Sequence, residues 1–445
     1  MVSPLLALMV GHPPTHVCRI RSSSRPQNNQ VAALRAANIK VATLNSTTPK
    51  SEKDTILEDL KCGHPLTRLL YVTPEYCVVD YFRRVLRIIH SQRELSRIAI
   101  DEAHCVSEWG HDFRKSYEDL SFFKREFPDV PVMCLTATAT ARVRQDVVST
   151  LGLDARRLKL FTMTTSRPNL HYEVRFKSDE QDHYDDFLGW LKGVHARRSS
   201  RPARASQLAA QRKRIDNVSG IIYTLFRADC ERLAARLRRD GVGAKAYHAG
   251  LSTAEKSDTL AGWVENRAGY DVIVATTAFG MGIDKEDVRF VVHWQIPKSF
   301  EGFYQEAGRA GRDGKAAICV TYYGREDRDR AANMLAREQA RNQYARGGAG
   351  GAAGGRGGAA GSTSNALSRA KSLQALVAYC ENTGQCRHQS ICDYFGEEIT
   401  PVCEWACDWH KAAKALAKRK EEGLASEEWC STQREMGAYA DDDYD

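Results

Sequence analysis

Short apolar runs alternate with amphipathic helical patterns along most of the chain. In the first part, β-branched apolar runs predict strands at 69–73, 97–101 and 131–135. A second series predicts strands at 220–224, 244–248, 272–276, 288–294 and 317–322, with helical patterns such as 228–239 and 252–266 between them. Strands separated by helices favour parallel sheets covered by helices. The pattern therefore predicts two α/β lobes, joined near 165–169.

Three segments break this alternation. Residues 11–29 are rich in Pro, Arg and Ser and interrupt an otherwise helical stretch. Residues 196–216 are basic and without a stable period, which predicts a mobile loop, and the Gly/Ala/Ser run 346–364 predicts a flexible tether. A Cys-rich segment, a charged helix at 411–422 and a polar tail follow.

Composition narrows the class of protein. The 445 residues suffice for two or three domains, and 42% apolar with 27% charged residues is typical of a soluble globular protein. A net charge of +8, with seven basic residues and no acid in 197–214, permits nucleic-acid binding without establishing it. Thirteen scattered cysteines indicate a reduced chain rather than a disulfide framework. We expect no signal peptide and no transmembrane helix.

An acidic pair follows the apolar run 97–100. Asp101 and Glu102 would lie at the carboxyl edge of a buried strand, where ligands bind in α/β folds. A hydrolytic motor needs a metal ion on the phosphates, a positioned water and cations that neutralise developing charge. An Asp-Glu pair alone is more often part of a solvated turn. The interpretation of Asp101 and Glu102 as hydrolytic residues therefore depends on the following Ala103-His104 and on the motifs described below.

Two arginines supply candidate cations. Arg309 and Arg312 lie three residues apart, which predicts one face of a helix that begins near Ser299. Arginine suits phosphate contacts through its permanent charge and planar fork. The small residues Gly308 and Gly311 beside them permit close approach by another lobe.

An aromatic-rich segment follows the acidic pair. Trp109 and Phe113 can stack on unpaired bases, each stack contributing about 1–3 kcal/mol, and Arg114 can contact a phosphate. The alternative is that both rings are core aromatics, but a tryptophan beside Gly, His and Asp is not typical of a core.

A metal-ligand pattern lies near the end of the chain. Cys386, Cys403, Cys407 and His410 form C-x16-C-x3-C-x2-H, a set of soft ligands suited to tetrahedral zinc. Cys380 and Cys392 are interpreted as core thiols, and His388 as a surface residue.

Together these motifs resemble the superfamily 2 helicases. Segments 101–104, 135–138, 278–284 and 305–314 resemble motifs II, III, V and VI. Segment 107–114 (Ser-Glu-Trp-Gly-His-Asp-Phe-Arg) resembles the aromatic-rich loop that couples DNA contact to ATP hydrolysis in the RecQ DNA helicases. Further similarities lie at 2–5, 71–75, 167–170, 220–223 and 247–251, and segment 379–397 resembles the RecQ zinc-binding subdomain.

The resemblance implies an α/β fold of two RecA-like parallel-sheet lobes, the first incomplete, followed by a small helical zinc-binding subdomain. It divides the chain into a partial first lobe (1–165), a second lobe (166–345), a Gly-rich linker (346–364), the zinc-binding subdomain (365–423) and a polar acidic tail (424–445). In the family four cysteines bind the zinc, whereas here the fourth position is His410. Cys₃His is a competent zinc shell whose affinity can differ.

The activity implied is ATP-dependent 3′–5′ unwinding of duplex DNA in repair, recombination or replication, with ATP, Mg²⁺ and Zn²⁺ as cofactors. Implied partners are single-stranded and forked DNA and DNA repair proteins, in the nucleus and without a membrane. The implied catalytic residues are Asp101, Glu102, His104, Gln305, Arg309 and Arg312. Nucleotide and metal contacts are expected from Asp101, Thr136, Thr138, Gly282, Asp284, Arg309 and Arg312. Contacts to DNA are expected from Ser3, Pro4, Thr73, Trp109, Phe113, Arg114 and Thr276.

One departure from the family concerns the phosphates. No Gly-rich loop ends in Gly-Lys-Ser/Thr, because the single Gly-Lys pair, Gly314-Lys315, is followed by Ala316. In the family the phosphate loop follows a central strand and precedes the segment with which this sequence starts. We therefore expect an opened first sheet with exposed edges, a poorly folded first lobe and negligible ATPase. Family members commonly continue into a winged helix that opens the duplex, whereas only a charged helix and a polar tail follow the zinc ligands here, so we do not expect these residues to supply that element.

Segment 11–29 is a second departure. Family members read Leu-Met-x-Asp-Gln-Val where this chain has Leu8-Met9, twenty residues, and then Gln30-Val31. A retained intron or misassigned start is one interpretation and a lineage-specific loop is the other. The functional alternatives are a non-catalytic DNA-binding remnant or adaptor and an RNA helicase. The aromatic loop and the zinc ligands argue against RNA.

Overall fold

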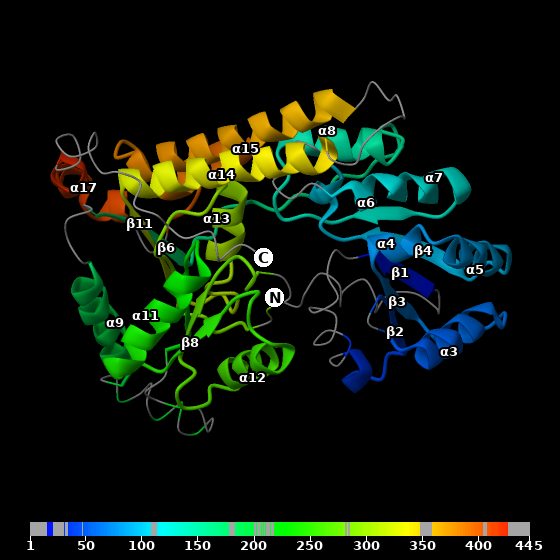
Figure 1. The fold of residues 1–445 in the computed structure, drawn as a ribbon, viewed down its shortest axis with the longest axis horizontal. Helices are drawn as coiled ribbons and strands as arrows, with labels where there is room; N and C mark the ends of the chain where they lie inside the picture. The colour runs from blue at the N-terminus through cyan, green and yellow to red at the C-terminus, as the bar shows by residue number, and fades with distance from the viewer. Residues whose placement is uncertain are drawn as a thin grey trace. The chain divides into compact units, whose positions relative to one another are not determined.

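The computed structural model describes residues 16–20, 31, 34–46, 48–107, 114–177, 183–199, 202, 206, 208, 210, 214, 218–280, 283, 285–347, 358–403 and 407–425. The chain forms two compact units (Figure 1). The first comprises Met1–Met163, Met281–Ile283 and Gly354–Arg369, and the second comprises Thr164–Gly280, Asp284–Ala353 and Ala370–Asp445.

The first unit is built on a parallel five-stranded sheet of order β2-β3-β1-β4-β5. Its strands are β1 (His16–Ile20), β2 (Val41–Leu44), β3 (Leu69–Val72), β4 (Leu95–Ile100) and β5 (Val132–Cys134). Its helices are α3 (Lys50–Lys61), α4 (Pro74–Cys77), α5 (Asp80–Ser91), η1 (Ala103–Val106), α6 (Lys115–Glu118), η2 (Asp119–Ser121), α7 (Phe122–Glu126) and α8 (Ala141–Thr150). The three strands predicted from apolar runs here are confirmed; β1 and β2 were not predicted.

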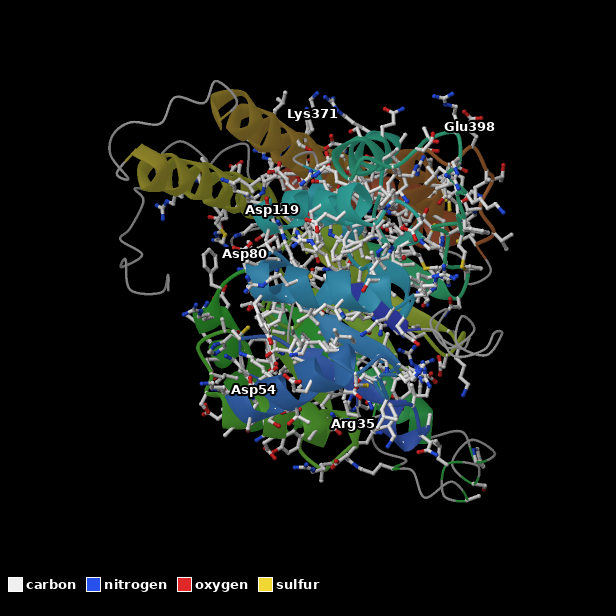
Figure 2. The ribbon with its side chains drawn as sticks, turned by 90° about the vertical axis from the view of Figure 1, so that its right-hand side faces the viewer. Arg35, Asp54, Asp80, Asp119, Lys371 and Glu398 are labelled. Carbon is white, nitrogen blue, oxygen red and sulfur yellow. The ribbon has the colours of Figure 1, made fainter. Side chains whose placement is uncertain are left out.

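The surface helices of this unit show why the apolar pattern is periodic. On α3, Ile56, Leu57 and Leu60 are buried in the core. Asp54 on the same helix is exposed, and so is Asp80 at the start of α5 (Figure 2). Apolar side chains recur with the helical period and face the sheet, so each helix is held by burial of one stripe.

The central strand of this sheet corrects two predictions. β1 lies within segment 11–29 and pairs in parallel with both β3 and β4. The segment is therefore not merely an insertion that interrupts a helix, and the sheet is not opened beside β4. The sequence His-Val-Cys-Arg-Ile contains two β-branched residues, which suit a strand, but the Pro and Ser residues around it dominated the sequence pattern.

The second unit contains a parallel six-stranded sheet of order β6-β11-β10-β7-β9-β8. Its strands are β6 (Leu170–Phe176), β7 (Gly220–Tyr223), β8 (Ala244–Tyr247), β9 (Val272–Ala275), β10 (Phe290–His293) and β11 (Ala317–Tyr323). Its helices include α9 (Tyr184–Ser199), α11 (Arg227–Arg239), α12 (Thr253–Val264), α13 (Phe300–Ala307) and α14 (Arg325–Gly347). Every residue of β7, β9 and β10 is buried, because helices cover both faces of a parallel sheet. All five strands predicted here are confirmed.

The Cys-rich module, residues 365–423, is helical. It contains most of α15 (Gly358–Glu381), all of α16 (Arg387–Phe395) and most of α17 (Asp408–Ala425). The α17 helix includes the charged helix predicted at 411–422. None of the helices in the described part of the chain is both long enough and apolar enough to cross a membrane.

Two predicted linkers contain more regular structure than expected. Helix α9 continues to Ser199, inside the predicted loop 196–216, and further on Leu208 is buried. Arg214 forms an ion pair of 2.9 Å with Asp271. Helix α15 begins at Gly358, so the end of the predicted Gly-rich tether is helical. Alanine and serine in these segments are compatible with helix, and neighbouring helical turns override the low-complexity composition.

Candidate functional site

Asp101 lies at the carboxyl edge of the first sheet, directly after β4. Ile98 and Ile100 are fully buried, and Asp101 is 9% exposed. The backbone there is tied to the neighbouring strand, because the Leu135 amide donates to the Ile100 carbonyl at 2.8 Å. The Tyr117 hydroxyl donates to the Asp101 carbonyl at 3.2 Å. The backbone that carries this carboxylate is thus held by contacts to the neighbouring strand and to Tyr117.

Glu102 adopts a left-handed backbone conformation, with φ 52° and ψ 44°. A residue with a Cβ adopts this region at a cost of about 1–3 kcal/mol, so the surrounding structure must hold it there. Two amides that follow it help to do so, since the Ala103 amide donates to the Leu135 carbonyl at 2.9 Å and the Cys105 amide donates to the Glu102 carbonyl at 2.9 Å. The kink aims the Glu102 side chain, which is 34% exposed, towards His104.

His104 connects the acidic pair to the segment after β5. Its Nδ1 lies 3.1 Å from Thr136 Oγ1 and 3.4 Å from Glu102 Oε2, and the imidazole is buried. The Thr138 amide donates to Thr136 Oγ1 at 3.3 Å. The structure therefore brings together Glu102, His104 and Thr136, which the sequence analysis assigned to catalysis or nucleotide contacts. The His104 imidazole thus connects the Thr136 hydroxyl with the Glu102 carboxylate.

Two of the candidate DNA contacts lie in the described part of the first unit. Thr73 precedes α4, where Pro74 occupies the first helical turn. The Arg114 amide donates to the Cys105 carbonyl at 2.9 Å, so the segment after the aromatic loop returns to η1. Ser3, Pro4, Trp109 and Phe113 lie outside the described residues.

The candidate arginines of the second unit lie in a turn rather than on a helix. Helix α13 begins after the Ser299 cap as predicted, but it ends at Ala307. Arg309 and Arg312 therefore belong to the following turn, Gly308–Asp313, which we call the arginine turn, and the predicted common helical face is wrong. Two glycines in four residues disfavour further helix, and Gly311 has a φ of +57°. Arg309 is 8% exposed, whereas Arg312 is exposed.

The segment before β6 holds the arginine turn. Arg167 donates from its guanidinium to the carbonyls of Gly308 (3.3 Å), Ala310 (3.2 Å) and Gly311 (2.9 Å). The Asn169 amide group donates to the Gly311 carbonyl at 2.9 Å as well. Segment 167–170 was predicted only to resemble the corresponding family segment, without a structural role. Its contacts are to backbone carbonyls, and such contacts do not depend on the side chains of the turn, so the sequence of the turn does not predict them.

Gly311 should be intolerant of a side chain. A Cβ there would lie 2.5 Å from the Asn169 amide nitrogen, in addition to the strain of the positive φ. We expect Gly311→Ala to lower the free energy of unfolding by about 2–3 kcal/mol. Gly314→Ala is the matched control, because Gly314 has a φ of +76° and nothing lies within 4 Å of its Cβ position. Urea unfolding of both variants measures the difference; equal losses would contradict the contact with Asn169.

A buried polar cluster lies beneath the arginine turn. His293 Nε2 lies 3.0 Å from Glu306 Oε2, and both side chains are buried. The Tyr223 ring stacks on His293, and its hydroxyl donates to the Phe279 carbonyl at 2.9 Å. Burial raises the pKa of Tyr223, and the nearby Arg309 charge opposes this shift. Arg309 thus lies near the aromatic side chain of Tyr223, a residue of the second sheet.

Of the remaining candidate residues of this unit, Thr276 and Gln305 lie in the described part of the chain. The backbone amide of Ala278 donates to Thr276 Oγ1 at 3.4 Å, just after β9. A Cβ on Gly280 would lie 3.7 Å from Arg309 Nη2, so the segment after β9 approaches the arginine turn. Gln305 lies on α13 and is partly buried. Gly282 and Asp284 lie outside the described residues.

The four predicted metal ligands converge. The three thiol sulfurs of Cys386, Cys403 and Cys407 and one ring nitrogen of His410 all lie within 4.8 Å of one another. The sulfurs of Cys386 and Cys407 are 3.8 Å apart, and Cys407 Sγ is 3.3 Å from His410 Nδ1. Zinc–sulfur bonds of about 2.3 Å in a tetrahedron require sulfurs about 3.8 Å apart. The donors and their spacing therefore fit zinc.

Electrostatics at this cluster favour a thiolate. Hydrogen bonding from the Cys386 thiol lowers the pKa of Cys407 far below its ordinary value, against the opposing effect of burial. The same interaction raises the pKa of Cys386. Neighbouring backbone amides and His410 add to the stabilisation of the Cys407 thiolate. A thiolate is the form that binds a metal ion, so the lowered pKa of Cys407 favours metal binding at this cluster.

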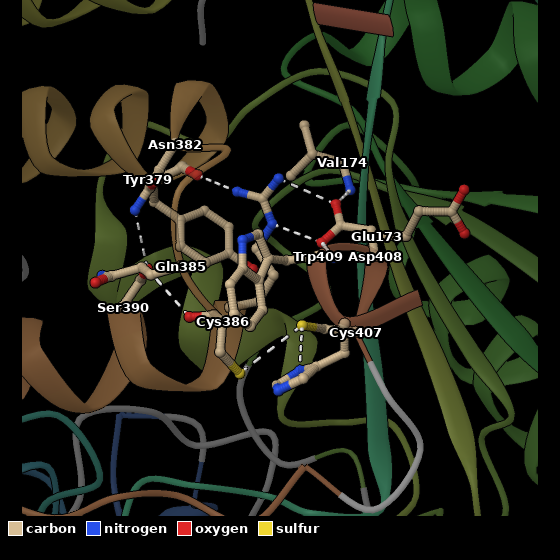
Figure 3. A network of polar contacts seen from close by, with 12 residues as sticks. Glu173, Val174, Tyr379, Asn382, Gln385, Cys386, Ser390, Cys407, Asp408 and Trp409 are labelled. Carbon is tan, nitrogen blue, oxygen red and sulfur yellow. Dashed lines mark hydrogen bonds and ion pairs between the residues drawn. The ribbon is translucent and has the colours of Figure 1, made fainter. Parts of the chain in front are cut away.

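A buried ion pair beside the cluster was not predicted from the sequence (Figure 3). Arg387 Nε and Nη2 donate to the two carboxylate oxygens of Asp408 at 2.9 and 3.0 Å, and both side chains are at most 1% exposed. Arg387 also donates to the Tyr379 carbonyl. The Asp408 carboxylate accepts further hydrogen bonds from the Val174 amide of β6 and from the Trp409 amide. The pair joins α15, α16 and α17 to the second sheet.

His388 was predicted to be a surface residue, and this is wrong. It is 1% exposed, its Nε2 lies 3.0 Å from the Leu170 carbonyl, and its ring meets Tyr172 edge-on at 5.0 Å. Burial lowers its pKa. Cys380 and Cys392 are fully buried thiols, as predicted. His388 lies one helical turn before the buried Ile391, a spacing that favours burial. The prediction of a surface position relied instead on the polarity of the histidine side chain.

Comparison with known proteins identifies the family. Three family models match the chain: DEAD/DEAH box helicase over residues 24–147, helicase conserved C-terminal domain over 203–314, and RecQ zinc-binding over 325–411. The chain belongs to the RecQ family of helicases. The first two models describe the helicase lobes in general, and the zinc-binding model, which covers the Cys386–His410 cluster, narrows the match to RecQ proteins.

Curated RecQ relatives match nearly the whole chain but are longer than it. ATP-dependent DNA helicase Q5 of Rattus norvegicus is 37% identical over 436 residues, which is 97% of this chain and 39% of the relative. RecQ-like DNA helicase BLM of Xenopus laevis is 36% identical over 370 residues, 83% of this chain and 24% of the relative. The chain thus spans less than half the length of these RecQ relatives.

Solved structures support the RecA-like fold. The DUF1998 helicase MrfA bound to DNA matches with a TM-score of 0.54 and 15% identity, over 72% of this chain and 44% of that one. Dbp5 of S. cerevisiae bound to RNA and ADP BeF3 matches with a TM-score of 0.50 and 16% identity, over 94% of this chain and 85% of that one. At this identity the likeness concerns the fold alone, and it confirms the predicted α/β fold with RecA-like parallel sheets in this RecQ chain.

Proposed function

We propose that the chain forms the motor lobes and zinc module of a RecQ-type ATP-dependent DNA helicase, which unwinds duplex DNA with 3′–5′ polarity in repair, recombination or replication. The observation that carries the proposal is the converging Cys386–His410 cluster on the same chain as the Asp101–His104 edge. The acidic edge is common to many nucleic-acid motors, whereas this cluster lies within the segment that the RecQ zinc-binding model matches. The RecQ relatives are named as ATP-dependent DNA helicases, which supports DNA as the substrate.

The residues of the first unit fit part of this chemistry. Asp101 would hold Mg²⁺, and Glu102 would orient and polarise the attacking water. The Glu102 side chain is 34% exposed, which is compatible with contact to a water molecule. Magnesium supplies charge neutralisation on the phosphates when bound. In the second unit, Arg309 and Arg312 would contact the phosphates, and in the first unit Thr73 and Arg114 would contact DNA.

The zinc would be held by Cys386, Cys403, Cys407 and His410. A structural zinc supplies folding free energy to a small module that cannot bury a sizeable core. The charge of the ion would be balanced in this site by the thiolates of Cys386, Cys403 and Cys407. Nothing in this role requires the ion to contact nucleotide or DNA.

We propose further that these 445 residues by themselves turn over little ATP. They contain no Gly-Lys-Ser/Thr run to hold the phosphates, although Asp101 and Glu102 are in place. We expect ATP hydrolysis in the presence of single-stranded DNA to be at least ~100-fold below the 1–10³ s⁻¹ typical of enzymes. A malachite-green assay measures it, with Glu102→Gln as the control. Brisk turnover that Glu102→Gln abolishes would contradict the proposal for this polypeptide and support the helicase assignment.

The other functional classes are separated by binding. A non-catalytic adaptor would bind forked or single-stranded DNA without ATP turnover, and an RNA helicase would prefer RNA. Gel shifts with forked DNA, single-stranded DNA and RNA of matched length, combined with the ATPase assay, separate the three. Residence in the nucleus follows from a role on DNA and is tested by localising the tagged chain in cells.

A further inference from the structure

Residues 164–170 connect two parts of the second unit that are far apart in sequence. On one side of this segment, Arg167 and Asn169 donate to carbonyls of the arginine turn, as described above. On the other side, the segment contacts the Cys-rich module. The segment therefore contacts both the arginine turn and the Cys-rich module, so a structural change in one of them can alter the position of the other.

Glu397, just after α16, makes the contact to the module. Its Oε1 accepts a hydrogen bond from the Thr165 amide at 2.7 Å, and its Oε2 accepts one from Thr164 Oγ1 at 2.9 Å. A carboxylate that accepts two hydrogen bonds from adjacent residues fixes both their position and their orientation. Nearby, Ser166 Oγ lies 3.5 Å from His388 Nδ1, and His388 Nε2 lies 3.0 Å from the Leu170 carbonyl. Two residues of the module thus hold the start and the end of the segment.

The module also holds the helix that leads into the arginine turn. Tyr394 of α16 stacks on Phe300 with ring centroids 4.0 Å apart, and its hydroxyl donates to Glu301 Oε1 at 2.6 Å. Tyr304 on the same helix donates from its hydroxyl to the Thr165 carbonyl at 3.0 Å. Helix α13 is therefore fixed near its start by the module and near its end by segment 164–170.

We propose that Arg167 and Glu397 are positioning residues, through which the Cys-rich module holds the arginine turn and thereby places Arg309 and Arg312. Arg167 suits this role because its planar fork reaches three carbonyls at once, which a lysine cannot do. The functional meaning rests on the proposed role of the two arginines, whereas the mechanical connection does not. The module therefore has a structural effect at the arginine turn in addition to its own fold.

Hydrogen exchange of backbone amides tests the connection without ATP or DNA. In the arginine turn and just after it, Gly311 donates to Val288, and Ala317 donates to Asn169 at 3.0 Å. Removing the Glu397 carboxylate should speed exchange of these amides by at least about fivefold, because each of the two hydrogen bonds that it accepts contributes a net stabilisation of that order. The amide of Val272, bonded to the Gly243 carbonyl at the far side of the sheet, should keep its rate.

Four variants of the full chain make the test specific. Glu397→Ala should speed exchange at the turn, and Glu397→Gln, which keeps one acceptor, should restore much of the protection. Glu398→Ala is the matched control, because the neighbouring Glu398 is exposed (Figure 2). Arg167→Lys should speed exchange at the turn while the protein keeps its zinc, measured by metal analysis.

The outcomes separate this inference from the proposed function. If Arg167→Lys loosens the turn and Glu397→Ala does not, the module does not act through segment 164–170 and the proposal is wrong. Faster exchange at Val272 as well would show a general loss of stability and would equally overturn it. Neither outcome depends on ATP turnover or unwinding, so the helicase assignment can fail while this connection stands, and the reverse.

Discussion

Replacing Cys407 by serine is expected to leave the protein without bound zinc. Cys407 is one of the four converging ligands, and its sulfur lies 3.3 Å from His410 Nδ1 and 3.8 Å from the Cys386 sulfur. A serine hydroxyl stays protonated and is a poor zinc ligand. Loss of a residue that only contacts a metal ligand typically lowers metal affinity by about 10–100-fold, so we expect loss of a ligand itself to lower the zinc affinity by at least ~100-fold. Metal analysis after dialysis should give about one zinc per wild-type chain and none for the variant.

The matched control is Cys392→Ser. Cys392 is a buried thiol on α16 outside the cluster, so its replacement should leave the zinc in place even if stability falls. In Cys407→Ser, amides of α16 and α17 should lose protection from hydrogen exchange, because a module of this size depends on its metal. Zinc retained by Cys407→Ser and lost from Cys392→Ser would show that the cluster is not the binding site.

The zinc ligands could be found from sequence because their residue types and spacing restrict their role. Three cysteines and a histidine at this spacing favour a metal site in a chain whose scattered cysteines do not indicate a disulfide framework. His388 lies in the same stretch and was placed wrongly, because its burial depends on the Leu170 carbonyl, 218 residues away along the chain. Contacts between distant segments leave no local pattern.

The arginine turn shows the same limit. The residues Arg309 and Arg312 were found from their motif, but the helix expected to carry them ends at Ala307. Helical spacing describes a continuous helix, whereas the turn depends on Gly311 and on hydrogen bonds from Arg167. Strand β1 was missed for a related reason, since its place in the sheet is decided by its neighbours β3 and β4 rather than by its own composition.

Replacing Arg387 by methionine is expected to destabilise the Cys-rich module by about 3–5 kcal/mol. Methionine keeps much of the volume and removes the charge, so the buried Asp408 carboxylate loses two hydrogen bonds of 2.9 and 3.0 Å. It would keep only the amides of Val174 and Trp409, too few to compensate a buried charge. Hydrogen exchange of the α16 amides measures the change in the free energy of opening.

The control compares this pair with an exposed one. Lys418 and Glu422 lie 3.4 Å apart on α17 with side chains 74% and 63% exposed, so Lys418→Met should change stability little. Arg387→Lys should fall between the two, because it keeps the charge without the fork that meets both carboxylate oxygens. A loss for Arg387→Met no larger than for Lys418→Met would contradict the structural role of the buried pair. A large loss confined to α15–α17 would place the pair, beside the zinc, among the interactions that join the module to β6.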